Sequence, residues 1–87
     1  MSGRKARRAF KKMGANFVTP DILRYHDAGD WGIELSTGNI LGNQVWGVSV
    51  INLETEKIVS DASKMFYSLE EAEAYISKIK KGRRKNK

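Results

Sequence analysis

The chain has 87 residues, of which 16 are basic and 10 acidic, and it contains no cysteine. Its length allows one small domain with a modest core, and the absence of cysteine excludes disulfide bonds, thiolate catalysis and cysteine-ligated zinc. No apolar run approaches the roughly 20 residues of a membrane span, and no apolar stretch follows the basic start as it would in a secretory signal. We therefore expect a cytoplasmic protein.

The charge is unevenly distributed along the sequence. Thirteen of the 16 basic residues lie in residues 1–12 and 78–87, whereas residues 13–77 hold three basic and all ten acidic residues. This pattern indicates an acidic domain with two cationic arms, and such asymmetry usually concerns a partner and not the fold. We expect a basic, partly helical arm over residues 1–16, a domain over residues 17–81, and a disordered basic tail over residues 82–87.

The N-terminal arm has a helical pattern from Arg4 to Met13. Ala6, Ala9, Phe10 and Met13 fall on one stripe. Ten residues form only a marginal helix in isolation. The helix is therefore expected either to dock through Phe10 and Met13 or to order only on a partner.

The next segments predict one short helix and one strand. Thr19-Pro20-Asp21 has the chemistry of a helix start, so a helix is expected from Pro20 to His26, ended by Ala28-Gly29-Asp30. Trp31, Ile33 and Leu35 then alternate with small or polar residues, which is typical of a half-buried strand. Turns are expected at residues 36–39 and at Gly42-Asn43.

The strongest strand runs from Gln44 to Leu53, with apolar residues on both faces. Glu54–Lys57 reads as a hairpin loop, in which Glu56 occupies the position that favours glycine. A third strand is expected from Lys57 to about Ser60 or further.

The last element is a helix that begins at a capping box, Ser68-Leu69-Glu70-Glu71. Its expected buried stripe is Leu69, Ala72, Ile76 and Ile79, flanked by Tyr75, and Gly82 is expected to end it. The fold class is therefore α+β: a short N-terminal helix, a three-stranded antiparallel sheet, and a C-terminal helix packed on one face in a small two-layer domain.

No residue pattern requires an enzyme. His26 is the only histidine, so no second histidine completes a ligand set with it and Asp27. Glu70 and Glu71 are explained by helix capping, and Glu73 by a solvated face. The glycines at 38 and 42 lack the lysine and hydroxyl of a phosphate-binding loop. We expect no catalytic residue, metal or cofactor.

Trp31 and Trp46 have two interpretations. Both are large enough to belong to the core of so small a domain. If either is exposed on the sheet, it could stack on a base or anchor a protein partner.

One part of the sequence, residues 44–76, resembles a known family. The strand Trp46–Val50, the Glu54–Lys57 turn and the run Phe66–Tyr75 are similar to the AP2-like, arm-type DNA-binding domain of tyrosine recombinases. The resemblance covers about 30 of the 87 residues. It implies a three-stranded sheet with a C-terminal helix. That family reads DNA with Arg and Lys from its strands, whereas residues 44–63 contain only Lys57, so no base-contacting residue is carried over.

The order of elements also matches the double-stranded-RNA-binding fold. That fold needs a lysine-rich start to its last helix, where this chain has Glu70 and Glu71.

The sequence favours a non-enzymatic nucleic-acid-associated protein that contacts the phosphate backbone of DNA or RNA through its basic arms. The alternative is an inhibitor or adaptor of a phage or mobile element, which binds a host nucleic-acid machine through its acidic domain. Membrane-surface binding ranks lowest, because little apolar surface accompanies the arms. The expected nucleic-acid-binding residues are Arg4, Lys5, Arg7, Arg8, Lys11, Lys12, Lys78, Lys81, Arg83, Arg84 and Lys85.

Overall fold

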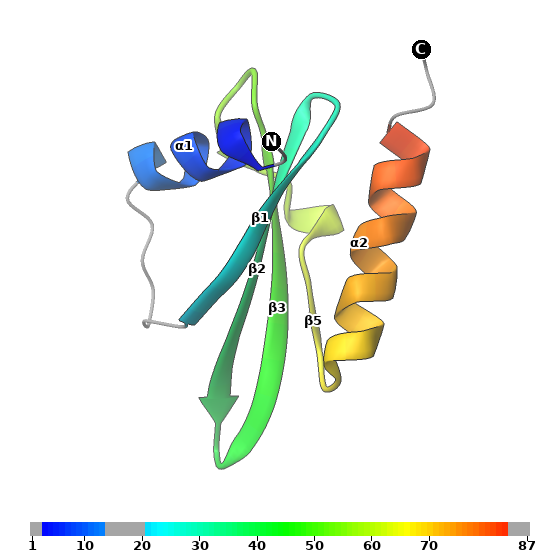
Figure 1. Ribbon diagram of the computed structural model, residues 1–87. Coiled ribbons are helices and arrows are strands. Elements are labelled where there is room, and N and C mark those ends of the chain that lie inside the picture. The colour runs from blue at the N-terminus through cyan, green and yellow to red at the C-terminus, as the bar shows by residue number, and fades with distance from the viewer. Residues whose placement is uncertain (1–2, 14–20, 84–87) are drawn as a thin grey trace.

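A helix precedes an antiparallel sheet, and a longer helix follows it, in the computed structural model, which describes residues 3–13 and 21–83 (Figure 1). The expected α+β class is confirmed. The elements in chain order are α1 (Arg4–Met13), β1 (Asp21–Ala28), β2 (Trp31–Ile40), β3 (Asn43–Asn52), β4 (Lys57–Ile58), the 3-10 turn η1 (Ser60–Ala62), β5 (Lys64–Phe66) and α2 (Leu69–Arg83).

The sheet has the order β1-β2-β3-β4, and β5 also pairs with β3. It therefore has more strands than the three expected. The additional strand at one edge is β1, where the sequence predicted a helix from Pro20 to His26. That prediction is wrong for the described part of the segment, because pairing with β2 along residues 21–28 outweighs the local helix-start signal. Thr19 and Pro20 lie outside the described residues.

The β2–β3 hairpin is longer than expected. Residues 36–39, predicted to form a turn, continue β2 and pair with residues 44–47. The Thr37 hydroxyl donates a hydrogen bond to the Val45 carbonyl at 2.8 Å, so this polar side chain is bonded to the neighbouring strand. The chain instead reverses at Leu41 and Gly42, both with positive φ, and Asn43 begins β3.

The third strand expected from Lys57 to Ser60 is interrupted. β4 has two residues, and the 3-10 turn η1 follows it. β5 then pairs with β3 again, in a register shifted by three residues from that of β4. Ser63 holds the interruption in place: its hydroxyl accepts from the Val50 amide and donates to the Val59 carbonyl, each at 3.0 Å. The hairpin loop before β4 is confirmed, and Glu56 takes the expected positive φ, at 61°.

The two helices lie on opposite sides of the sheet (Figure 1). The larger core cluster lies under α2 and consists of Ala28, Ile33, Leu35, Val48, Val50, Ala62, Ala72 and Ile76. A smaller cluster under α1 consists of Ala6, Ala9, Phe10 and Ile51, with Tyr25 and Leu53 packed against it. Helix α1 thus adds a partial third layer to the two expected.

Helix α2 follows most of its sequence prediction. The Ser68 hydroxyl accepts a hydrogen bond from the Glu71 amide at 3.1 Å, so the expected cap is present. Ala72 and Ile76 are buried, but Leu69 is 38% exposed and does not continue the buried stripe. Gly82 does not end the helix, which continues to Arg83.

Candidate nucleic-acid interface

Helix α1 docks on the sheet through its small apolar underside. Ala6 is fully buried, and Phe10 packs beside Tyr25 with ring centroids 6.0 Å apart. Gly32 of β2 lies directly beneath: a Cβ on this residue would lie 2.9 Å from the Ala6 Cα, so glycine permits the close approach. Of the two expected outcomes for this helix, docking is the one observed. The Met13 side chain lies outside the described part of the chain.

The N-terminus of α1 is capped from a distant strand. The Asp27 carboxylate accepts hydrogen bonds from the Ala6 amide at 2.8 Å and from the Lys5 amide at 3.2 Å. The first turn of α1 contains no acidic residue of its own. Asp27 therefore supplies both the cap and the negative charge that a helix N-terminus favours. This positions α1 against β1.

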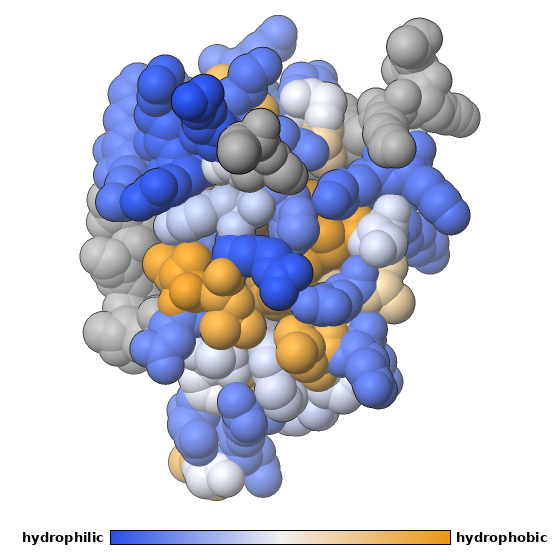
Figure 2. Space-filling model, viewed as in Figure 1, coloured by the Kyte–Doolittle hydropathy of each residue, from blue (hydrophilic) through white to orange (hydrophobic). Residues whose placement is uncertain are grey.

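The outer surface of α1 is strongly cationic. All six basic side chains expected to bind nucleic acid in this segment are exposed, and Figure 2 shows the resulting hydrophilic surface over α1. Lys12 forms an ion pair with Glu56 at 3.1 Å. Because the apolar stripe faces the sheet, the cations face outward together. They are Arg4, Lys5, Arg7, Arg8, Lys11 and Lys12.

An open groove runs between α1 and β1, with a volume of about 710 Å³. Of the described residues, four cations and no carboxylate line it, together with half-exposed apolar side chains from β1. In Figure 2 the apolar patch lies beside the hydrophilic surface of α1. The groove thus combines positive charge with an apolar floor. Its lining residues are Gly3, Arg4, Arg7, Lys11, Ile22, Leu23, Arg24 and Tyr25.

A smaller pocket of about 140 Å³ lies on the other side of β1, against α2. Arg24 lines both this pocket and the groove, so it lies between the cations of α1 and Lys80 of α2. Lys80 reaches the pocket from α2, where its Nζ lies 3.3 Å from the Nδ1 of His26. Neither Arg24 nor Lys80 was among the expected site residues. The spacing of Arg24 and His26 would place both on one face only if this segment were read as a strand.

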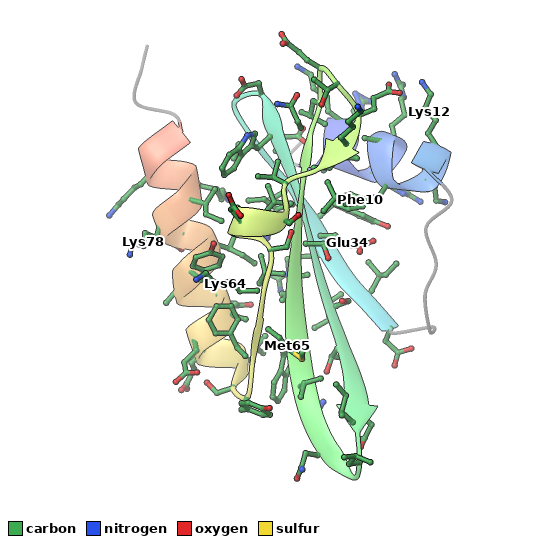
Figure 3. The ribbon with its side chains drawn as sticks, turned by 180° about the vertical axis from the view of Figure 1, so that it is seen from behind. Phe10, Lys12, Glu34, Lys64, Met65 and Lys78 are labelled. Carbon is green, nitrogen blue, oxygen red and sulfur yellow. The ribbon has the colours of Figure 1, made fainter. Side chains whose placement is uncertain are left out.

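The other expected residues lie toward the end of α2. Lys78 and Lys81 are exposed, and Lys78 projects from the side of α2 away from the sheet (Figure 3). Arg83 is the last residue of the helix, and its side chain is outside the described set, as are Arg84 and Lys85.

Trp31 and Trp46 both lie on the sheet face covered by α2. Each is partly buried and packs against the larger core cluster. Part of each indole remains accessible at the margin of that core.

Glu34 is a half-buried carboxylate of β2, on the sheet face away from α2 (Figure 3). Burial raises the pKa of Glu34, and a hydrogen bond with Tyr25 partly opposes the shift. Burial and the neighbouring Glu34 likewise raise the pKa of Tyr25. Tyr25 also lines the groove, where the nearby Arg7 cation acts in the opposite direction and lowers the pKa of Tyr25.

Over residues 3–13 and 21–83, no three His, Asp or Glu side chains gather where they could hold a metal ion. Neither described helix is long and apolar enough to cross a membrane.

Comparisons with known proteins return no relatives: no protein-family model, curated protein or solved structure matches this chain.

Proposed function

We propose that this protein is a small, non-enzymatic nucleic-acid-associated protein that binds the phosphate backbone of DNA or RNA. The observation that supports the proposal is the cationic surface of α1: six exposed basic side chains on a helix fixed to the sheet, bordering a groove that no described carboxylate lines. A polyanion lying along this surface would contact several cations at once. Lys78 and Lys81 on α2, on the other side of the sheet, would contact a separate stretch of backbone.

The mechanism is the release of counterions from the nucleic acid. Each phosphate that a lysine or arginine neutralises releases bound cations, which gives affinity with little sequence specificity. The fixed helix has a further advantage over a flexible arm, because its cations lose less conformational freedom on binding. Ile22 and Leu23 would contact sugars or bases that enter the groove beside α1. The resemblance to the recombinase arm-type domain stays a prediction.

The salt dependence of binding tests this proposal. The double variant Arg7→Gln, Lys11→Gln removes two charges that line the groove, and glutamine preserves helix propensity. If both residues contact duplex phosphates, the slope of log K against log salt should become shallower by about 2. Fluorescence anisotropy with a labelled duplex and with a labelled single strand measures it.

The matched control is Lys57→Gln, Lys64→Gln, which removes two exposed cations from β4 and β5. It should leave the slope almost unchanged. Equal losses in the two double variants would refute a role for α1 and indicate a general charge effect. Circular dichroism checks that both variants keep their helix content.

A further inference from the structure

The pocket between β1 and α2 contains a cluster of hydrogen-bond donors, of which Arg24 is the one that also lines the groove beside α1. Arg24 and His26 are two residues apart on β1, so their side chains share the face covered by α2. Ser77 and Lys80 are three residues apart on α2, so they share the helix face toward β1. Two elements distant in sequence thus bring a guanidinium, an imidazole, a hydroxyl and an ammonium to one pocket of about 140 Å³.

The positive charge in this pocket is incompletely neutralised by the described residues around it. Glu73 is the carboxylate that lines it, and its Oε2 lies 3.8 Å from the Arg24 Nη1. Both side chains of this pair are about half exposed, so the pair is weak. Lys80 points its ammonium at the imidazole of His26, which is a neutral acceptor in this arrangement.

Protonation of His26 is disfavoured in this environment. Burial lowers the pKa of His26, and the neighbouring Lys80 and Arg24 cations lower it further. Two carboxylates act in the opposite direction, Glu73 on α2 and Asp27 on β1. A bound anion would reverse the balance, because it would stabilise the imidazolium together with the two cations.

We propose that this pocket binds a phosphate group carried as inorganic phosphate or as a phosphate monoester. Arg24, Lys80 and Ser77 would donate hydrogen bonds to its oxygens, and His26 would donate once protonated. Arginine provides paired N–H donors that suit phosphate oxygens, and charge-assisted hydrogen bonds are the stronger kind. The phosphate would replace Glu73 as the partner of Arg24. The site goes beyond backbone binding by α1 and does not depend on it.

His26 reports on the pocket directly, because it is the only histidine of the chain. The NMR signal of its ring C–H, followed against pH, gives its pKa in sodium phosphate and in sodium chloride of equal ionic strength. Phosphate should raise the pKa of His26 by about one unit or more. An identical titration curve in both salts would overturn the proposal.

Two variants separate specific binding from general charge effects. Lys80→Gln should remove most of the response of His26 to phosphate. Lys57→Gln removes the same charge from β4, outside the pocket, and should retain the response. A full response in Lys80→Gln, or an equal loss in Lys57→Gln, would contradict the site. The amide spectrum of each variant shows whether the fold is retained.

The source of the phosphate is distinguished with two oligonucleotides of one sequence, one ending in a 5′-phosphate and one in a 5′-hydroxyl. A larger shift of the His26 signal with the phosphorylated strand assigns the site to nucleic-acid ends. A response to inorganic phosphate with no difference between the strands assigns it to small phosphate compounds. The Arg7→Gln, Lys11→Gln variant should keep its response to inorganic phosphate even where backbone binding is lost, so the two proposals fail separately.

Discussion

Leu41 adopts a backbone conformation that leucine rarely occupies. Its φ is 51°, in the left-handed region, and its side chain is 96% exposed at the tip of the β2–β3 hairpin. The adjoining Gly42 tolerates its own φ of 84° without cost, because glycine has no Cβ. Two-residue hairpin turns of this kind favour asparagine before glycine. The turn therefore carries strain at Leu41 that no side-chain burial offsets.

Leu41→Asn should stabilise the protein by about 1 kcal/mol, because asparagine tolerates the left-handed region. Thermal denaturation followed by circular dichroism measures the change. Leu41→Ala is the control: it removes the exposed apolar group but retains the strained backbone, so the melting temperature should stay near that of the parent. Stabilisation by alanine as large as that by asparagine would show that exposure of leucine, and not its backbone, is the source of the cost.

Helix α1 depends on contacts that are distant in the sequence. Its cap comes from Asp27, 21 residues away from the nearer amide, and its close approach requires Gly32. Gly3 has a φ of +86°, and a side chain there would collide with the Tyr25 backbone. None of these features belongs to the local helical pattern, and each places α1 against one part of β1 and β2.

Asp27→Ala should lower the free energy of unfolding by about 0.5–2 kcal/mol, the usual cost of losing a helix cap. Hydrogen exchange of the amides in α1 should accelerate more than exchange in β3, because the lost cap acts first on the helix. Asp21→Ala, at the exposed start of the same strand, is the matched control and should leave α1 protection unchanged. Uniform loss of protection in both helices would contradict a local role for Asp27.

At the scale of elements, the sequence predicted the elements that have a strong hydrophobic period and missed those that form only by pairing with another strand. The spacing of Ala72 and Ile76 and the cap at Ser68 gave α2 correctly, since both signals are local. Residues 21–28 carry a helix-start signal but pair with β2 along their length. The pairing register with β3 shifts by three residues across η1. Because three is an odd number, the set of alternate residues that faces α2 changes at this point, so a simple period of two could not describe residues 57–66.

Over the whole molecule, the cations of α1 lie near an acidic loop. Lys12 pairs with Glu56, which belongs to the exposed loop between β3 and β4 with Glu54, and Asp61 is exposed on η1. The sequence predicted the cations of α1 because they occur in one run. The sequence did not indicate that Arg24 and Lys80 line one pocket, because the two residues meet only when β1 forms an edge strand against α2.

The triple change Glu54→Lys, Glu56→Lys, Asp61→Lys separates the two functions that the sequence left open. If these acids only repel phosphate, nucleic-acid affinity should rise, since three charges reverse and Lys12 is released. If they form the contact surface of an inhibitor or adaptor, capture of its basic partner should be lost. Anisotropy with labelled DNA and RNA measures the first. Unchanged or weaker nucleic-acid binding would contradict the backbone proposal.

The concentration of positive charge on α1 also bears on the helix itself. Arg4, Arg8 and Lys12 follow one another at intervals of four residues, and Arg7 and Lys11 do the same, so like charges adjoin along the helix surface. Salt screens such repulsion. Local unfolding of α1 should therefore be easiest at low ionic strength, where attraction to a polyanion is strongest. A bound phosphate backbone would take over the screening that salt provides, so the helix would be most ordered when its partner is present.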